Sequence, residues 1–414
     1  MPETGHPASL PALSAQDWLV RAQPVFRALA AAGHEARAVG GAVRNALMGL
    51  PVGEVDLATT AKPEQIIAAC EAAGLKCVPT GLAHGTVTII AGGSAYEVTT
   101  LREDVETFGR HAKVAYTTDW TADARRRDFT MNALYCTSHG VVSDPLGGWP
   151  DVVQRRVRFV GDPAKRIRED YLRILRFFRF HAEFGEAAPD AAGLGACVRE
   201  RQGLATLSAE RVRSELLKLL SAADPLAGIR PMYEFGLLAL LLHAAPRPGL
   251  LARLVAAEQD VAAPIDAILR LSALTVAVAD DIPTLADRLR LSNAEHDSLI
   301  VIDHNAAALG ELTGKAARRA LYKAGAEQWR RRVLAAAAAG AGPNWRTLHA
   351  LPLSWQVPHF PLRGGDALAL GMAPGPRVGD LLARIEDWWI ESNFVPDESA
   401  LRKRLANTAA ENPS

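Results

Sequence analysis

Residues 39–57 have the sequence VGGAVRNALMGLPVGEVDL, and this stretch decides the fold of the first part of the chain. A β-like run ends at Val39, a two-glycine turn follows, and a short helix is expected next. A second β-like run then carries Glu54 and Asp56, two residues apart. Side chains two apart on a strand point to the same face, roughly 6.6 Å apart along the chain. The stretch therefore predicts two strands that bring a glycine turn and a pair of carboxylates together.

The composition narrows the class of protein. The chain has 414 residues, enough for about two to four domains, and its 49% hydrophobic and 22% charged residues are typical of a globular protein. It contains no run of about 18 apolar residues, and its first residues lack the basic start and apolar core of a secretory signal. The four cysteines are scattered without CxxC spacing, which favours free thiols in a reducing cytoplasm. The net charge is zero, but the basic residues are clustered along the chain, so a nucleic-acid enzyme is not excluded.

Two sequence textures predict an α+β protein, in which a small head with a mixed sheet is followed by an extended all-α body. Up to about residue 150, short runs rich in Val, Ile and Thr alternate with helical stretches. Later, Leu, Ala and Arg recur at helical spacing. The predicted strands are 36–39, 55–58, 85–90 and 95–100, and the clearest predicted helices are 15–32, 63–73, 164–184, 208–221 and 266–279. The predicted domains are a head at 1–150, a helical neck at 151–235, and a helical body and tail at 236–414.

The carboxylates of the head suit a hard cation. Glu54 and Asp56 offer the oxygen ligands that Mg²⁺ prefers. Glu97 lies in an apolar strand-like run, and a third carboxylate on a neighbouring strand would suit a two-metal site. Gly40 and Gly41 let the backbone approach a phosphate closely, and free N–H groups at the helix start can bind it. The alternative is a surface strand with solvated acids after an ordinary turn.

A second cluster, RRRDFTMNAL at residues 125–134, combines three cations, an acid and an amide. Arginine suits phosphate because its planar guanidinium donates two parallel hydrogen bonds. Asp128 could orient one of the arginines, and Asn132 could bind a ribose hydroxyl or the backbone. On composition alone, a solvated basic face is the alternative.

A third cluster, residues 166–180, has strong helical patterning that places Asp170, Arg173 and Arg176 on one face. Cytosine and adenine present an exocyclic amine beside an unprotonated ring nitrogen, whereas guanine and uracil present a carbonyl beside a ring N–H. A carboxylate that accepts from the amine and a guanidinium that donates to the ring nitrogen would therefore select C and A. An unmatched buried polar group costs about 1–3 kcal/mol. The alternative is an ordinary helix surface on which Glu169 pairs with Arg173.

These motifs resemble those of the nucleotidyltransferase superfamily that includes DNA polymerase beta. GGAVRN with EVDLATT, RRDFTMNAL and EDYLR are most similar to the class II tRNA nucleotidyltransferases and poly(A) polymerases, over about residues 36–225. The resemblance implies that Glu54 and Asp56 hold the catalytic metals and that Glu97 completes the catalytic carboxylates. The residues it implies for nucleotide binding, with Arg176 added from the shared helix face, are Gly40, Gly41, Arg44, Arg126, Asp128, Asn132, Asp170, Arg173 and Arg176.

Two positions depart from the family pattern, and one further helix agrees with it. Glu54 and Asn45 each stand where Asp is common in the family. The longer arm of Glu54 could alter the metal geometry. Residues 207–216 resemble the ERxxxEL helix of the family, which braces the helix that recognises the base.

The predicted function is template-independent addition of CMP, CMP and AMP to the 3′ end of tRNA, from CTP and ATP, with Mg²⁺ as the cofactor and release of pyrophosphate. The helical body would hold tRNA mostly through phosphates and shape. A cytoplasmic location, no membrane association and no stable protein partner are expected. The candidate RNA-binding residues, for which a solvated helix is the alternative, are Lys315, Arg318, Arg319 and Lys323.

Three other functions compete with CCA addition. Adenosine-only addition, by a poly(A) polymerase or by one of a split pair of CC- and A-adding enzymes, shares the head motifs. The compact chain, without a basic extension, favours CCA addition over a poly(A) polymerase. A catalytically inactive nucleotide sensor would explain Glu54, but Asp56, Glu97 and the arginine cluster are intact. A helical RNA-binding scaffold without chemistry would leave the head motifs unexplained.

Overall fold

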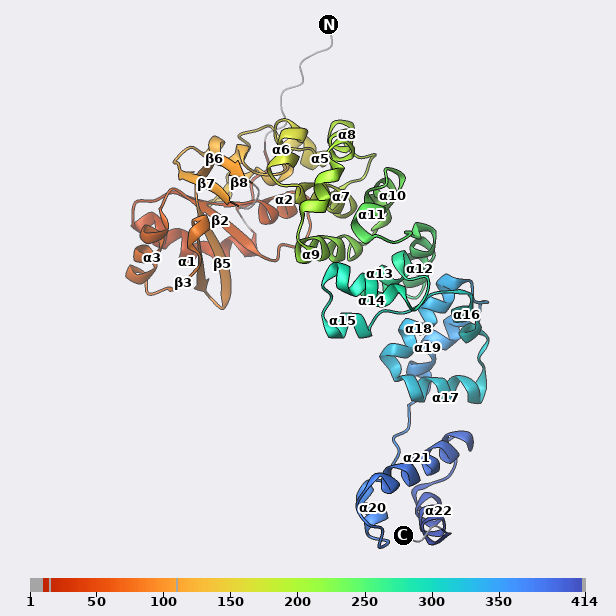
Figure 1. Ribbon diagram of the computed structural model, residues 1–414. Helices are drawn as coiled ribbons and strands as arrows, with labels where there is room; N and C mark the ends of the chain where they lie inside the picture. The colour runs from red at the N-terminus through yellow and green to blue at the C-terminus, as the bar shows by residue number, and fades with distance from the viewer. Residues whose placement is uncertain (1–9, 15, 109–110, 412–414) are drawn as a thin grey trace. The chain divides into compact units, whose positions relative to one another are not determined.

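The computed structural model describes residues 10–14, 16–108 and 111–411. It divides into two compact units, unit 1 (Met1–His243) and unit 2 (Ala244–Ser414). Unit 1 contains the sheet and the first helices, and unit 2 is helical (Figure 1). The predicted fold class, an α+β head followed by an all-α body, is confirmed. The predicted boundary between neck and body at residue 235 stays a prediction.

A seven-stranded mixed sheet forms the head. The strand order is β3-β4-β5-β2-β1-β8-β9, in which β2 and β5 are parallel and the other neighbours are antiparallel. The strands are β1 (Ala36–Val39), β2 (Val55–Thr59), β3 (Lys76–Gly81), β4 (Thr86–Ala91), β5 (Ser94–Thr100), β8 (Tyr135–Thr137) and β9 (Val142–Ser143). A separate antiparallel pair consists of β6 (Arg102–Phe108) and β7 (His111–Tyr116).

One face of the sheet is covered by two helices, α1 (Asp17–Ala31) and α3 (Pro63–Ala72) (Figure 1). Alternate residues of β4, such as Val87 and Ile89, are fully buried, as expected for a strand with one face in the core. Pro63 begins α3 at a position where its missing N–H costs nothing. The predicted helices over 15–32 and 63–73 and the four predicted strands are therefore confirmed to within two residues at each end.

The opposite face is covered by residues 120–135, which we call the arginine segment. This segment contains α4 (Trp120–Arg125) and the 3-10 turn η2 (Thr130–Asn132). Ala58 of β2 packs in one buried cluster with Ala124 and Tyr135 of the segment. Because Asp56 is two residues from Ala58, it lies on the same face. The packing therefore brings the arginine segment to the carboxylate that the sequence predicts as a metal ligand.

Seven helices follow the head within unit 1. They are α5 (Trp149–Val153), α6 (Pro163–Glu169), α7 (Leu172–Phe184), α8 (Ala191–Arg199), α9 (Ala209–Leu220), α10 (Leu226–Glu234) and α11 (Leu237–Leu242). The helix predicted over 208–221 is confirmed as α9. The single helix predicted over 164–184 is wrong: the chain is extended at Asp170, with φ −156° and ψ 107°, so α6 ends at Glu169 and α7 begins at Leu172. Phe129 of the arginine segment packs against Phe177 and Phe180 of α7, which fixes α7 to the head.

Unit 2 is built from helices around two apolar clusters. The helices are α12 (Pro248–Asp260), α13 (Ala267–Thr275), α14 (Asp281–Leu289), α15 (Asn293–Asp297), α16 (His304–Ala307), α17 (Gly314–Ala324), α18 (Ala326–Ala339), α19 (Trp345–Ser354), α20 (Gly364–Leu368), α21 (Pro376–Glu391) and α22 (Glu398–Glu411). Trp329 is fully buried in the first cluster and donates its indole N–H to the Leu348 carbonyl at 2.7 Å. The predicted helix over 266–279 ends earlier, at Thr275, because Val276 is extended.

Two global expectations concern the whole chain. Cys70, Cys77, Cys136 and Cys197 are free thiols, as the sequence predicts. Across the part of the chain that the structure describes, no helix combines the length and the apolar character needed to cross a membrane.

Candidate active site

Three neighbouring strands in the middle of the seven-stranded sheet, β5, β2 and β1, present the candidate catalytic carboxylates. Asp56 on β2 is in register with Glu97 on the parallel strand β5 and with Val39 at the end of β1. Both carboxylates keep access to solvent. Neighbouring strands are roughly 4.8 Å apart, so the two side chains leave the sheet side by side. Glu54 is also exposed, but β2 begins at Val55, so Glu54 precedes the strand instead of sharing it as predicted.

The carboxylates of Asp56, Glu97 and Glu54 repel one another. Partial burial and the neighbouring Glu97 raise the pKa of Asp56, and Glu54 adds to the rise, while the Arg127 guanidinium opposes it. A carboxylate pair of this kind is stabilised by a bound cation, and its oxygen donors fit a hard divalent ion. Within the described residues, however, no group of three or more His, Cys, Asp or Glu side chains is already gathered to hold a metal. The residues thus fit a metal ion through Asp56 and Glu97, with Glu54 close by in the chain.

The glycine turn connects the end of β1, where Val39 pairs with Asp56, to α2 (Gly41–Leu47). Gly40 has φ 72° and ψ −127°, and residues with a Cβ rarely adopt such a positive φ. A Cβ on Gly40 would lie 3.7 Å from a guanidinium nitrogen of Arg127. The turn therefore places backbone and arginine against each other, beside the row of carboxylates.

Arg44 of α2 is a buried link instead of a free surface cation. Its guanidinium donates to the Asn132 side-chain oxygen at 2.6 Å and to the Asn45 side-chain oxygen at 2.7 Å. It also lies over the Phe184 ring, 3.9 Å from the ring centre. Burial lowers the pKa of Arg44 to about 10, so it is still protonated at neutral pH. Arg44 therefore ties the glycine turn to η2 and to α7.

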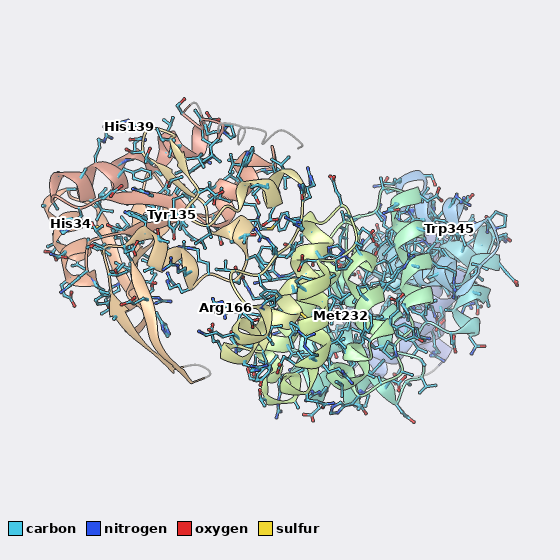
Figure 2. All side chains as sticks on the ribbon, turned by 90° about the horizontal axis from the view of Figure 1, so that it is seen from above. His34, Tyr135, His139, Arg166, Met232 and Trp345 are labelled. Carbon is cyan, nitrogen blue, oxygen red and sulfur yellow. The ribbon has the colours of Figure 1, made fainter. Side chains whose placement is uncertain are left out.

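The arginine segment is organised by Asp123, a residue that sequence reasoning missed. The Asp123 carboxylate is fully buried and accepts hydrogen bonds from Arg126 at 2.7 Å, Arg127 at 3.0 Å and the Tyr135 hydroxyl at 2.7 Å. Burial opposes ionisation, but the two arginines and Tyr135 hold the pKa of Asp123 below its usual value. Tyr135 lies within the head (Figure 2). Arg127 was also missed, although it is adjacent to the predicted Arg126 in the sequence.

Asp128 joins the segment to the neck. Its carboxylate accepts from the Asn132 amide at 3.1 Å and from both Arg176 nitrogens, Nε at 2.8 Å and Nη2 at 2.5 Å. Burial alone would raise its pKa, but Arg176 and Asn132 lower the pKa of Asp128 to about 2. On α9, Glu215 accepts from Arg179 at 2.6 Å and lies 3.7 Å from Arg176. The predicted nucleotide-binding residues Asp128, Asn132 and Arg176 thus form one connected network.

The predicted base-recognising pair is not joined side chain to side chain. Asp170 accepts from Arg211 of α9 at 2.7 Å, whereas Arg173 donates to Glu169 and to the Arg166 carbonyl, each at 2.7 Å. The Glu169–Arg173 ion pair, which the sequence offered as the alternative to base recognition, is therefore present. Arg166 also donates to the carbonyls of Arg126 and Arg127, which connects α6 to the arginine segment. The role of α9 as a brace is explained by Arg211 and Glu215.

The predicted RNA-binding cations lie on α17 of unit 2. Lys315 and Arg319 are exposed. Arg318 lies over the Trp355 ring at 5.6 Å, and Lys323 pairs with Asp387 at 3.2 Å. Two of the four cations are therefore partly engaged by the protein, and Lys315 and Arg319 are the better candidates for contact with a phosphate backbone.

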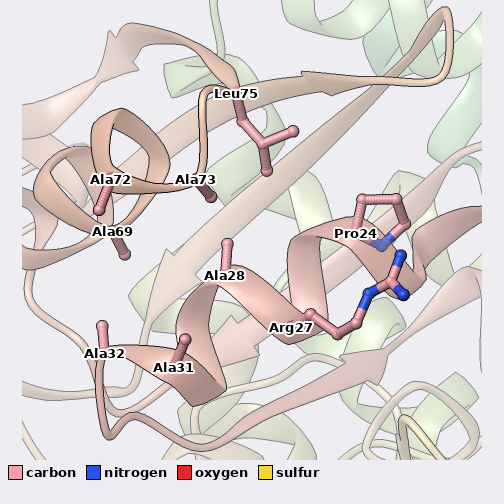
Figure 3. A pocket seen from close by; sticks show the side chains of 9 residues that line it. All are labelled: Pro24, Arg27, Ala28, Ala31, Ala32, Ala69, Ala72, Ala73 and Leu75. Atoms are coloured by element: carbon pink, nitrogen blue, oxygen red, sulfur yellow. The ribbon is translucent and has the colours of Figure 1, made fainter.

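Two pockets in unit 1 have other linings. One, of about 380 Å³, lies between α1 and α3 and is lined by six alanines, Pro24, Arg27 and Leu75, without a carboxylate (Figure 3). The second, of about 590 Å³, lies beside α6 and includes Arg125, Lys165 and Arg166. Asp56 and Glu97 line neither pocket. The catalytic candidates are therefore recognised by strand register and charge.

Comparison with known proteins finds two families along the chain. Residues 36–158 match the family described as the poly A polymerase head domain. Residues 194–250 match the family described as a probable RNA and SrmB-binding site of polymerase A. The first match includes the glycine turn, the carboxylates and the arginine segment.

Similar proteins extend the match to almost the whole chain. The mitochondrial CCA tRNA nucleotidyltransferase 1 of Mus musculus is 34% identical over 386 residues, which cover 91% of this chain and 87% of the mouse protein. The CCA-adding enzyme of Levilactobacillus brevis is 31% identical over 389 residues, covering 91% of this chain and 94% of that enzyme. The crystal structure of the Bacillus stearothermophilus CCA-adding enzyme with CTP is 29% identical, with a TM-score of 0.72 over 96% of this chain and 98% of that chain.

Proposed function

The chain belongs to the tRNA nucleotidyltransferase and poly(A) polymerase family, and from that premise we infer that it is a CCA-adding enzyme. It adds CMP, CMP and AMP to the 3′ end of tRNA from CTP and ATP, without a nucleic-acid template, and releases pyrophosphate. The observation that carries this choice is the extent of the match. The CCA-adding relatives align with the helical body as well as with the head, over 91% of this chain.

The chemistry of this family depends on divalent metal ions, and we propose Mg²⁺ as the ion. Asp56 and Glu97 would hold it, with Glu54 as a further oxygen ligand. When bound, the ion supplies charge stabilisation to the attacking and leaving oxygens of the transferred phosphate. The mutual repulsion of these carboxylates supports the assignment, because it raises the pKa of Asp56 even though the Arg127 guanidinium opposes that rise.

The triphosphate would lie between the glycine turn and the arginine segment. The Gly40 turn allows close approach of backbone N–H groups, and Arg126 and Arg127 supply guanidinium donors. Arg44, Asn132 and Asp128 stand behind these groups as a connected frame. This proposal gives Arg44 a supporting role, since its donors are already used inside the protein.

We retain Asp170 and Arg173 as the proposed base-recognising pair. Each has an internal partner, Arg211 for Asp170 and Glu169 for Arg173. Binding of a cytosine or adenine edge would therefore require these side chains to share or exchange those partners. The pair would accept from the exocyclic amine and donate to the ring nitrogen, which guanine and uracil cannot match. Leaving such groups unmatched would cost about 1–3 kcal/mol.

One assay separates the candidate functions. Purified protein is incubated with a tRNA that ends before CCA, with Mg²⁺ and with each labelled nucleotide alone and in combination. We expect CMP to be incorporated twice and AMP once, with AMP dependent on prior CMP addition. Incorporation of AMP alone, or of long tails, would replace the proposal by adenosine-only addition. No incorporation at all would leave the inactive sensor.

The location of the protein in the cell is a separate proposal. The sequence favours the cytoplasm, whereas the name of the mouse relative places that protein in mitochondria. Fractionation of the source cells, followed by immunodetection, tests the cytoplasmic location directly.

A further inference from the structure

Asp123 is a buried carboxylate that holds two arginines of the candidate active site. Its side chain is fully buried, and one oxygen accepts from Arg126 while the other accepts from Arg127 and from the Tyr135 hydroxyl. Only about one sixth of each arginine side chain is exposed, 16% for Arg126 and 17% for Arg127. Both guanidinium groups are therefore bound to one fixed carboxylate. The geometry of that carboxylate sets the direction of their remaining N–H donors.

The position of Arg127 gives this arrangement a catalytic context. One of its guanidinium nitrogens lies 3.7 Å from where a Cβ on Gly40 would be. Arg127 is also the cation that opposes the rise in the pKa of Asp56 that burial and Glu97 cause. Its Nε donates to the Tyr135 hydroxyl at 3.3 Å and its Nη2 donates to Asp123 at 3.0 Å, so the Nε–Nη2 edge of the guanidinium is held and Nη1 is the nitrogen beside Gly40. A phosphate bound at the glycine turn would therefore contact Arg127.

We infer that Asp123, together with Tyr135, is a positioning residue that orients Arg126 and Arg127 toward the triphosphate of the incoming nucleotide. This inference rests on the proposed function, because it needs a nucleoside triphosphate between the glycine turn and the arginine segment. Asp123 touches neither the nucleotide nor the reacting atoms. It acts by fixing the guanidinium planes before the substrate arrives, since misplacement of a binding group by about 1 Å can cost about 100-fold in rate.

A second buried aspartate provides a matched control. Asp151 is also fully buried, binds two arginines, Arg156 and Arg158, and accepts from the Thr130 hydroxyl. Both of its arginines lie outside the arginine segment and are more exposed, at 42%. Asp123 and Asp151 are therefore alike in burial and bonding but differ in where their arginines lie.

The test uses the full-length enzyme with tRNA ending before CCA. Asp123→Asn removes the charge with little change in shape, Tyr135→Phe removes a single hydroxyl, and Asp151→Asn serves as the control. We expect Asp123→Asn to raise KM for CTP about 10- to 100-fold and KM for tRNA less than 2-fold. Tyr135→Phe should raise KM for CTP about 2- to 5-fold. Asp151→Asn should change KM for CTP less than 2-fold, even if its melting temperature falls equally.

A double-mutant cycle distinguishes positioning from a general structural role. If Asp123 acts through Arg127, the Asp123→Asn change in an Arg127→Lys background should cost far less in kcat/KM for CTP than it costs in the wild type. Additive effects in the cycle, or an unchanged KM for CTP in folded Asp123→Asn and Tyr135→Phe enzymes, would overturn the inference. A wild-type enzyme that incorporates no nucleotide would instead contradict the proposed function, so the two failures are distinguishable.

Discussion

Asp56 and Asp128 lie in the same unit and have opposite electrostatic surroundings. Asp56 on β2 is in register with Glu97 on β5, and its pKa is raised by burial and by that neighbour. Asp128 is more deeply buried, yet Arg176 and Asn132 lower its pKa to about 2. The positive charge near Asp56 does not offset burial and repulsion, whereas the hydrogen bonds and positive charge at Asp128 more than offset its burial. The contrast supports the proposal that Asp128 belongs to the frame of the site and that Asp56 would bind a cation from outside the chain.

Substitution of Asp56 tests this contrast with the largest expected effect. Asp56→Asn removes a proposed metal ligand and relieves the repulsion with Glu97. We expect CMP incorporation to fall about 1,000-fold, comparable to the loss of a key transition-state donor, while the melting temperature stays the same or rises. Steady-state incorporation and thermal unfolding measure the two quantities. Activity within 10-fold of the wild type would remove Asp56 from the metal site.

Substitution of Asp128 should affect the stability of the fold more than the catalytic activity. Its folded pKa lies below its usual value of 3.8, so the ionised form stabilises the fold above about pH 4, and this stabilisation is lost as the pH falls toward 2. The shift corresponds to about 2 kcal/mol of unfolding free energy. Asp128→Asn should lose this amount at pH 7 and show a flatter acid limb in denaturant unfolding between pH 4 and 2. The exposed Asp297→Asn is the control. An unchanged acid limb in Asp128→Asn would contradict the frame role.

The proposed base-recognising pair lies between these extremes, because each member has an internal partner that it can exchange. Asp170→Asn should allow UTP to compete with CTP, with an increase of about 10-fold in the ratio of UMP to CMP incorporated, as expected for about 1–2 kcal/mol of lost discrimination. The control is Arg168→Ala, whose side chain on α6 is 61% exposed and pairs with Glu200. An unchanged ratio in Asp170→Asn would require another source of base selection.

The smallest effect is expected in unit 2. A double substitution, Lys315→Glu with Arg319→Glu, reverses two exposed charges on α17. We expect KM for tRNA to rise about 3- to 10-fold, with a weaker salt dependence of tRNA binding by about two units of slope, and no change in KM for CTP. Arg290→Glu, at a residue whose side chain is 65% exposed, is the control for reversal of a single exposed charge elsewhere in unit 2. An unchanged KM for tRNA would move the RNA-binding surface off α17.

Four strands of the seven-stranded sheet and the two helices on one of its faces could be predicted because their signals are local. The runs at 36–39 and 55–58 alternate or stay apolar as strands do, and Pro63 marks a helix start. The strands β3, β8 and β9 and the pair β6–β7 were not predicted, since they are short or polar and are defined by their partners. The break at Asp170 was not predicted either, because its sequence keeps helical periodicity through the residue that becomes extended.

The site shows the same division between local and tertiary information. The glycine turn, Asp56, Glu97, Asp128 and Asn132 were found from motifs that are continuous in the sequence. Asp123 and Arg211 were not assigned roles, because their importance lies in partners that only folding brings together, Arg126 and Arg127 for Asp123 and Asp170 for Arg211. A useful signal in retrospect is the spacing of Asp123 to Arg126 and Arg127, which is i, i+3 and i, i+4 along a helix.

The most direct test of the central claim is Mn²⁺ binding followed by electron paramagnetic resonance, with Mn²⁺ as a probe for the divalent ion. We predict that the wild type binds Mn²⁺ in the presence of a non-hydrolysable CTP analogue. Asp56→Asn with Glu97→Gln should weaken Mn²⁺ binding by at least about 10-fold, because it removes the two carboxylates that are in register. Asp128→Asn should bind as the wild type does. Equal Mn²⁺ affinity in the wild type and the Asp56/Glu97 double variant would contradict the account.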